Sequence, residues 1–242
     1  MENKYQMSKE ENIFLAKRNI VDYLWKSANL EGIAVTYPDT QAIYDGLSVS
    51  NMKIDDLVTI NNLKKAWQFL LDGINLPTDF PFICRINQVV GGDNLISQAG
   101  KIRSIPVSIG GTDWKPALPI EVSVKKDIEE INSIKIQTQR AITLMLYCMR
   151  QQLFIDGNKR TAMLVGNHIM IKHGCGIISV PINQQNKFFE LLVEFYTSAK
   201  PDAVMNFVYE NCIDGLDFSG QDRDLTGLGT EKQEKWWRDS SN

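Results

Sequence analysis

The sequence is poor in the residues from which metal and redox centres are built. It contains two histidines, His168 and His173, and four widely separated cysteines with no C-x-x-C pair among them. Zinc and dithiol sites need such residues at short, regular spacings, so neither kind of centre is expected. We instead expect the cysteines to be reduced and mostly buried thiols; they are Cys84, Cys148, Cys175 and Cys212.

An excess of positive charge and a long apolar run are also missing. The chain of 242 residues carries 26 basic and 29 acidic residues, and the net charge of −3 argues against a general nucleic-acid binder. No apolar run approaches the ~18 residues that cross a bilayer, and the polar N-terminus lacks the apolar segment of a signal peptide. We therefore expect a cytoplasmic protein without membrane association.

What the sequence does contain is a series of apolar residues at helical spacing. Hydrophobic residues make up 43% of the chain, which suits one large globular domain with appendages. Apolar residues recur three, four and seven positions apart, and glycine or proline follows most of these segments. The pattern predicts a mainly α protein, with helices near 9–30, 40–45, 54–72, 82–95, 120–150, 159–172, 183–199 and 201–212.

Two segments depart from the helical pattern. In residues 100–111 the apolar side chains fall mostly on alternate positions, which predicts extended chain. Pro106 lacks an amide hydrogen, so this strand should lie at an edge or in an isolated hairpin. Aliphatic residues are few after Cys212, and we expect residues 213–242, including Trp236 and Trp237, to form a flexible or loosely docked tail.

Candidate chemistry lies where two apolar helical patterns meet. Asp156, Gly157 and Asn158 form a turn sequence, and Lys159 and Arg160 open the helix that follows. A helix N-terminus presents unpaired N–H groups and a positive dipole end, which attract phosphate. Arg160 can hold phosphate oxygens, and Asp156 can hold Mg²⁺. An ordinary turn followed by solvated basic residues accounts for the same pattern, so composition alone leaves both interpretations open.

The longer motif Phe154-Ile-Asp-Gly-Asn-Lys-Arg-Thr161 resembles the signature of the Fic/Doc family. Two further segments are similar to features of that family. The extended residues 102–109 resemble its flap, a β-hairpin that pairs with a target segment, and Ser27-x-x-x-Glu31-Gly32 resembles its N-terminal inhibitory motif. The implied fold is a mainly α Fic-type helical bundle with a small β-hairpin flap. Its implied parts are an N-terminal helical region with the inhibitory motif (1–50), a Fic-like core (51–212) and the tail (213–242).

The resemblance implies transfer of AMP from ATP to a hydroxyl of a protein, with Mg²⁺ as cofactor. Carried over by motif position, Asp156 holds the metal, Gly157 and Asn158 with the helix N-terminus cradle the phosphates, and Arg160 binds them. The residues implied in contacts with the nucleotide are Phe154, Gly157, Asn158, Lys159 and Arg160. Those implied in docking a protein substrate on the flap are Ile102, Arg103, Ile105 and Val107.

Residue 152 departs from the family motif. The family has a histidine there as general base, whereas this chain has Gln152, and Leu153 replaces the proline that follows. An amide can position a hydroxyl but cannot take its proton, and loss of a general base typically costs about 10²–10⁴-fold in rate. His168 lies roughly 15 Å along the helix from Asn158 at ~1.5 Å per residue, and His173 is farther, so both are expected to be structural or surface residues.

Met163 is the second departure. Many family members have another arginine there, which contacts the γ-phosphate and pairs with the inhibitory glutamate. Glu31 must therefore find another partner, such as Arg160, Lys159 or a backbone amide, unless it is simply a surface carboxylate near a helix end. Lys159 and the absent arginine make this loop more similar to that of Doc, which transfers phosphate.

Three functions remain open from the sequence. They are an autoinhibited AMP transferase that is weak or inactive because of Gln152, a non-catalytic nucleotide-binding regulatory module, and a Doc-like phosphotransferase or a transferase of another phosphate-containing group. The missing base favours the second, whereas the retained Asp156 and Arg160 favour the first or third. We favour the AMP-transferase type with impaired activity. The oligomeric state, including a homodimer, is open.

Overall fold

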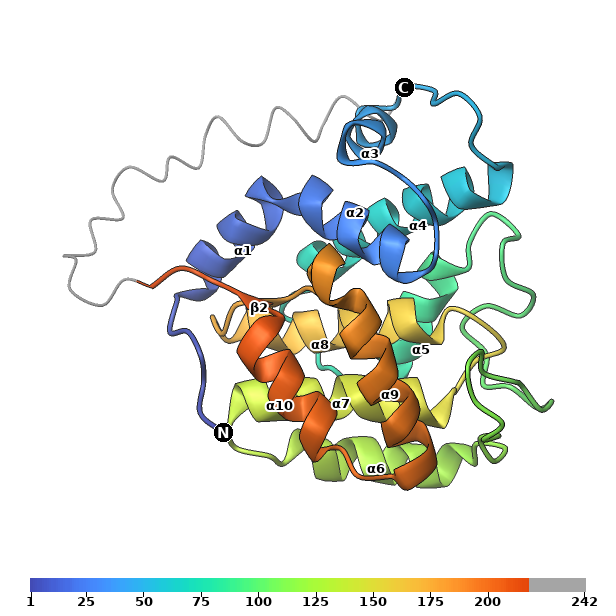
Figure 1. The fold of residues 1–242 in the computed structure, drawn as a ribbon. Coiled ribbons are helices and arrows are strands. Elements are labelled where there is room, and N and C mark those ends of the chain that lie inside the picture. Colours follow the sequence, from blue (N-terminus) through green and yellow to red (C-terminus); the bar gives the residue numbers. More distant parts are fainter. Residues whose placement is uncertain (218–242) are drawn as a thin grey trace.

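Ten α-helices make up most of residues 1–217, the part of the chain that the computed structural model describes (Figure 1). The first five are α1 (Lys9–Arg18), α2 (Ile20–Leu30), α3 (Tyr37–Tyr44), α4 (Ile54–Asp72) and α5 (Phe80–Val90). The others are α6 (Glu121–Asn132), α7 (Gln137–Gln151), α8 (Asn158–Lys172), α9 (Gln185–Ser198) and α10 (Asp202–Asn211), with a short 3₁₀ helix, η1 (Ile182–Gln184), before α9. The prediction of a mainly α protein is confirmed.

Side-chain caps explain where several helices begin. Ser8 and Glu11 form a capping box at the start of α1, because each side chain accepts a hydrogen bond from the backbone N–H of the other. The Thr36 side chain caps α3 by accepting a hydrogen bond from the backbone N–H of Asp39. The helix predicted over 9–30 is divided at Asn19, which ends α1 and precedes α2.

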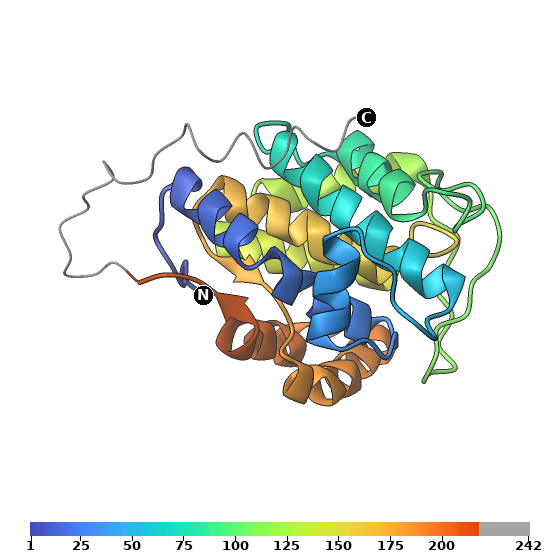
Figure 2. The same ribbon diagram turned by 90° about the horizontal axis from the view of Figure 1, so that it is seen from above.

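Helices α7 and α8 form the centre of the molecule. They pack along each other, with α5 and α4 on one side and α10 and α9 on the other, so that Figure 2 shows three layers of helices. Every residue of α8 from Arg160 to Ile171 is buried. A helix covered on all sides cannot shift without disturbing the core, so its N-terminus is a rigid base for a binding site.

The N-terminal helices share their core with the rest of the chain. Leu15 of α1 and Leu24 of α2 belong to one buried cluster with Trp67 of α4 and Leu164 of α8. Consequently α2 is held in place against α4 and α8, and its C-terminal end lies beside the first turn of α8.

A small antiparallel sheet joins two distant segments. β1 (Ile177–Ile178) follows α8 and pairs with β2 (Ile213–Asp214), with Ile177 opposite Asp214. Residues 213 and 214 are therefore part of the fold, which corrects the predicted start of the tail. Residues 218–242, where the rest of the predicted tail lies, are outside the described residues.

The predicted β-hairpin at residues 102–109 is wrong in its backbone structure. Residues 101–120 form an extended loop without a strand, seen in green beside the loop that precedes α8 (Figures 1 and 2). The carbonyls of Ile105 and Ala117, on the two arms of this loop, accept hydrogen bonds from the Arg103 guanidinium. Those carbonyls are thus not paired across a strand ladder. We keep the name flap loop for residues 101–120.

The cysteine prediction agrees with the described residues. All four cysteines are free, and three of them are buried, whereas Cys84 is partly buried. No helix within residues 1–217 has both the length and the apolar character needed to cross a membrane.

Candidate functional site

The turn between α7 and α8 is bounded by two residues with left-handed backbone conformation. Gln152 ends α7 with a φ of 46°, and Gly157 precedes α8 with a φ of 74°. A Cβ atom on Gly157 would lie 2.9 Å from Ile96 and 3.1 Å from Val90. Glycine is therefore required at this position both for its backbone angle and for the close approach of its neighbours.

Asn158 holds this turn in shape. Its Oδ1 accepts from the Phe154 N–H at 3.0 Å, and its Nδ2 donates to the Phe154 carbonyl at 2.8 Å and to Oε1 of Gln152 at 3.0 Å. The side chain is buried, and its hydrogen bonds are spent on the loop. These contacts support a role for Asn158 in orienting the loop.

Asn87 of α5 supports the turn from behind and was missed by the sequence analysis. Its Nδ2 donates to the Asp156 carbonyl at 3.0 Å and to Oγ1 of Thr161 at 3.1 Å, while its Oδ1 accepts from the Gly100 N–H at 2.8 Å. A fully buried amide with these partners links α5, the residue before the flap loop and the start of α8. The available signal was an asparagine on the same face of a predicted helix as Ile83 and Val90.

Four charged side chains meet at the first turn of α8. The Arg160 guanidinium lies with its Nε 3.0 Å from Glu31 Oε2 and its Nη2 3.4 Å from Asp156 Oδ2. Lys159 Nζ is 3.6 Å from Glu31 Oε1 and donates to the Leu30 carbonyl at 3.1 Å. Glu31 is thus paired with Arg160 and Lys159, two of the partners proposed from the sequence in place of the absent arginine.

Arg160 is buried although it does not use all its donors. The residue is 7% exposed, and its Nε and Nη1 atoms lack a hydrogen-bond partner with acceptable geometry. A buried guanidinium normally has its donors satisfied, because an unpaired buried polar group costs about 1–3 kcal/mol. The Nη1 donor is therefore unused, whereas Nε is ion-paired with Glu31.

Two spaces adjoin this charge network. The outer cleft has a volume of about 330 Å³ and is lined by Glu31, Gln152, Asp156 and Lys159, among others. The inner space, of about 10 Å³, is lined by Arg160 and Met163 together with Glu31 and Lys159, which therefore face both spaces. The Glu31 carboxylate consequently lies between the outer cleft and Arg160, and a ligand entering the cleft meets this carboxylate first.

Helix α9 contributes an aromatic wall to the outer cleft. Lys159 Nζ lies 4.7 Å from the ring centroid of Phe189, a cation–π contact that holds the lysine at the rim. Tyr196 also lines the cleft, and burial together with the negative charge of Glu31 raises the pKa of its hydroxyl. Tyr196 therefore keeps its proton at neutral pH. Neither aromatic residue was singled out from the sequence.

Arg103 fixes the base of the flap loop. Its guanidinium donates to the carbonyls of Gln152 at 2.5 Å, Ala117 at 2.6 Å and Ile105 at 3.0 Å. The backbone N–H of Arg103 donates to the Leu153 carbonyl at 2.9 Å. The residue is only 2% exposed, and burial lowers its pKa. The predicted role of this side chain in docking a target is therefore corrected, because it ties the flap loop to the backbone of residue 152.

A second contact fixes the far arm of the flap loop. The Trp114 ring stacks on Tyr196 at a centroid distance of 5.9 Å, and the Arg150 guanidinium lies 4.7 Å from the Trp114 centroid. Between the two anchors, Ser108, Ile109 and Gly110 line the outer cleft. The tip of the flap loop thus borders the cleft even though it is not a β-hairpin.

The other predicted residues lie as follows. Phe154 is 2% exposed and buried in the main core, which corrects its predicted contact with the nucleotide. Ser27 lines the inner space, and Gly32 ends α2 with a φ of 81°. In the flap loop, Ile105 is exposed, whereas Ile102 and Val107 are partly buried.

His168 is a structural residue, as the sequence predicted. Its Nδ1 accepts a hydrogen bond from Oγ1 of Thr78 at 2.7 Å, and its Nε2 donates to the Gly73 carbonyl at 3.1 Å. A carbonyl can only accept, so these partners require the tautomer with the proton on Nε2. Burial lowers the pKa of His168 to about 4. The imidazole is therefore neutral at physiological pH.

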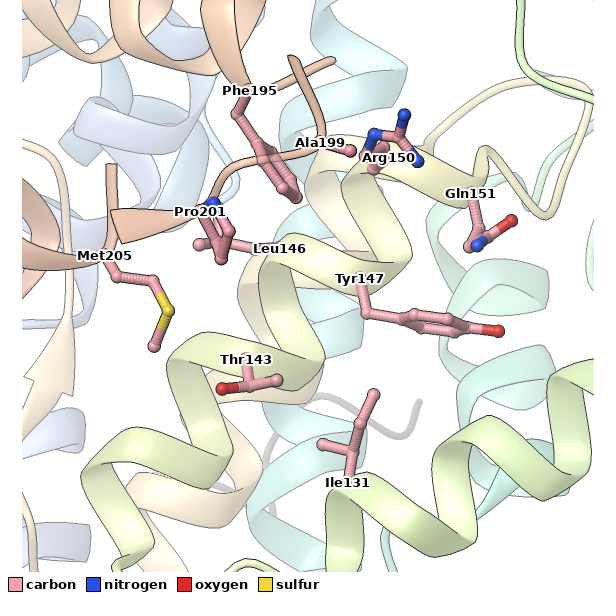
Figure 3. A pocket seen from close by; sticks show the side chains of 10 residues that line it. All are labelled: Ile131, Thr143, Leu146, Tyr147, Arg150, Gln151, Phe195, Ala199, Pro201 and Met205. Atoms are coloured by element: carbon pink, nitrogen blue, oxygen red, sulfur yellow. The ribbon is translucent and has the colours of Figure 1, made fainter. Parts of the chain in front are cut away.

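A second, mostly apolar pocket lies on the other side of α7. Figure 3 shows Ile131, Leu146, Tyr147, Phe195 and Met205 around it, and its volume is about 230 Å³. Arg150 stands at its edge, so the pocket adjoins the anchor of the flap loop. None of the predicted site residues lines it.

The comparisons with known proteins address the same region. Residues 77–170, which include the turn, α8 and the flap loop, match the model of the Fic/DOC family. This part of the chain is similar to the Fic/DOC family. Among the curated proteins none matches. The matched range runs from α5 to most of α8, so Glu31 and α9 are contributed by segments outside it.

Solved structures with the same fold are also Fic proteins. Fic-1 from C. elegans has a TM-score of 0.66 and 22% identity, over 86% of this chain and 63% of the other. A Fic domain containing signaling protein from Bacteroides thetaiotaomicron has a TM-score of 0.68 and 18% identity, over 84% of this chain and 85% of the other. At these identities the likeness shows the fold, and this chain spans less than two thirds of the C. elegans chain.

Proposed function

We propose that this protein is an autoinhibited Fic-type transferase that binds ATP with Mg²⁺ and moves AMP to a hydroxyl of a protein, weakly because residue 152 is glutamine. The observation that carries the proposal is the buried Arg160 guanidinium at the start of α8, whose Nη1 has no partner. The match of residues 77–170 to the model of the Fic/DOC family supports a Fic-type transferase at the level of the family.

The residues around the turn suit Mg²⁺ held together with phosphates. Asp156 lines the outer cleft with a side chain that is 65% exposed, and no group of three or more His, Cys, Asp or Glu residues that could hold a metal occurs in residues 1–217. Mg²⁺ commonly takes one or two carboxylates, with water and substrate phosphates as its remaining ligands. Asp156 would therefore hold the ion, which supplies charge neutralisation at the transferred phosphoryl group when bound.

Gln152 limits the reaction at proton removal. Its Nε2 donates to the Met149 carbonyl at 2.6 Å, and its Oε1 accepts from Asn158, so the amide is held in place at the cleft. The remaining lone pair of Oε1 can accept a hydrogen bond from a target hydroxyl, but an amide does not take the proton. The proposed AMP transfer therefore lacks general-base assistance.

Glu31 supplies the inhibition. Its carboxylate is 16% exposed and pairs with both cations of the cradle, so a phosphate that reaches Arg160 must displace it. A phosphate beside the Glu31 carboxylate would also meet a like charge, so nucleotide affinity should be lower in the unchanged chain than in Glu31→Gly. Relief of inhibition therefore requires a movement of α2 or of the Glu31 side chain.

The test is a transfer assay with two labels on ATP. The full chain, Glu31→Gly, Gln152→His and the double variant are incubated with Mg²⁺ and either α-labelled or γ-labelled ATP, and label bound to protein is measured. We expect α-label on protein for the double variant, traces for Glu31→Gly, and less for the other two. Glu31→Gln is the matched control, because it keeps the size of the side chain and removes its charge.

The other outcomes identify the competing functions. Transfer of γ-label would replace our proposal with a phosphotransferase. ATP binding by Glu31→Gly without label from any variant would indicate a non-catalytic binding module, which the fixed and non-basic amide of Gln152 specifically favours. Failure of Glu31→Gly to bind ATP would refute the phosphate cradle itself.

A further inference from the structure

The phosphate cradle contains two cationic side chains in the described part of the chain. They are Lys159 and Arg160, on the first turn of α8. The next residue toward the C-terminus on this face is Met163, one turn beyond Arg160, because residues three apart are neighbours on a helix. Met163 is 7% exposed and belongs to the main core.

The space beyond Arg160 is small and largely apolar. It measures about 10 Å³, and its lining includes the apolar side chains of Leu63, Trp67, Met163 and Leu164. A single water molecule needs about this much room, so a phosphate group does not fit there. Phosphates can therefore be accommodated at the amides of α8 and at Arg160, but not further along the helix.

Glu31 closes the remaining direction. Its carboxylate faces both the outer cleft and the inner space, so a further phosphate directed toward α2 would meet a negative charge. Removal of the carboxylate in Glu31→Gly opens this direction without adding a cation. A phosphate that instead points into the outer cleft would be solvated and would gain little.

We infer that this site recognises a diphosphate unit and does not distinguish a nucleoside triphosphate from the corresponding diphosphate. The inference rests on the proposed nucleotide cradle and specifies its ligand class: nucleotides are held through two phosphates, with no side chain dedicated to a third. Its structural basis is the apolar Met163 together with the closed space beyond Arg160.

Calorimetry on the full-length Glu31→Gly protein with Mg²⁺ tests the inference. We expect the Kd values of ATP and ADP to agree within about threefold, and AMP, which has one phosphate, to bind at least about tenfold more weakly. Introducing Met163→Arg into this background should favour ATP over ADP by about tenfold, because a charge-assisted hydrogen bond to the third phosphate is added. Met163→Leu is the matched control and should leave the ratio unchanged.

The ratio of the ATP and ADP Kd values measured on Glu31→Gly tests the inference even if Met163→Arg prevents folding. ATP binding at least tenfold tighter than ADP binding would overturn the inference and leave the proposed cradle intact. Equal binding of AMP and ADP would overturn it as well, because the second phosphate would then contribute nothing. Absence of binding for all three nucleotides would refute the cradle, and the inference with it.

Discussion

Replacing Arg103 with methionine should detach the flap loop from the turn that precedes α8. The guanidinium makes three side-chain hydrogen bonds of 3.0 Å or less, to the carbonyls of Gln152, Ala117 and Ile105. Each hydrogen bond to a charged group is worth about 1.5–3 kcal/mol, which sets an upper range of roughly 5–9 kcal/mol if the loop stayed in place. The loop can open and hydrate its carbonyls, so we expect a smaller loss of about 3 kcal/mol in the free energy of unfolding.

Urea denaturation measures the global effect, and amide hydrogen exchange of residues 104–117 measures the local one. Methionine retains most of the aliphatic volume of arginine, so lost packing contributes little. Arg85→Met is the matched control, because Arg85 is exposed on α5 and bonds only Gln88 among the described contacts, at 2.6 Å. A loss below about 0.5 kcal/mol for Arg103→Met, with unchanged exchange in the loop, would refute the role that we assign to this guanidinium.

Two further predictions concern backbone conformation and pH. Gly157→Ala should cost about 2–4 kcal/mol of stability and at least tenfold in nucleotide affinity, because its φ is 74° and a Cβ would lie 2.9 Å from Ile96. Gly46→Ala, with a φ of 81° and open space around it, should cost only about 1 kcal/mol and leave affinity unchanged. The lowered pKa of His168, about 4, means that the unfolded chain binds more protons between that pH and about 6.5, so stability should fall by up to about 3 kcal/mol as the pH drops through this window. Urea titrations at pH 7 and pH 5 check the last effect, and an equal pH dependence in His168→Gln would contradict it.

The helices were predictable wherever apolar periodicity coincided with a clear end. The predicted range 54–72 equals α4, and the pattern over 159–172 matches α8 to within one residue. The break at Asn19 was missed because apolar residues continue on both sides of it. The predicted helix over 82–95 extended too far, since α5 ends at Val90 and Gly91 follows as its cap.

The flap loop shows why its structure was harder to predict than its location. Alternation of apolar residues in 102–109 indicated extended chain, and this segment is extended and borders the cleft. Alternation says nothing about what satisfies the backbone carbonyls, and here one buried arginine from the loop itself does so. From the sequence alone Arg103 is expected on the surface. Its buried position is set by hydrogen bonds to residues that are distant in the chain, such as the Gln152 carbonyl.

The motif residues were predictable as a group, but their separate duties were not. The turn sequence identified Asp156, Gly157 and Arg160 at the start of α8, where they lie. Phe154 and Asn158 belong to the same motif, yet Phe154 is buried in the core, and Asn158, although it lines the cleft, uses its hydrogen bonds to hold the turn. Spacing in the sequence cannot separate a residue that contacts a ligand from a residue that shapes the loop.

Inhibition and the missing base act on different steps, so their effects should multiply. Removing Glu31 frees Arg160 for phosphate and raises occupancy of the site, but it adds no proton acceptor. General-base assistance is worth about 10²–10⁴-fold, or roughly 3–5 kcal/mol of activation free energy, which no increase in occupancy can supply once the site is full. Gln152→His alone would supply a base to a site that Glu31 still blocks. The gain of the double variant should consequently equal the product of the gains from the two single changes, because no hydrogen bond or ion pair among the described residues joins the Glu31 and Gln152 side chains. A larger gain would show that the two residues interact.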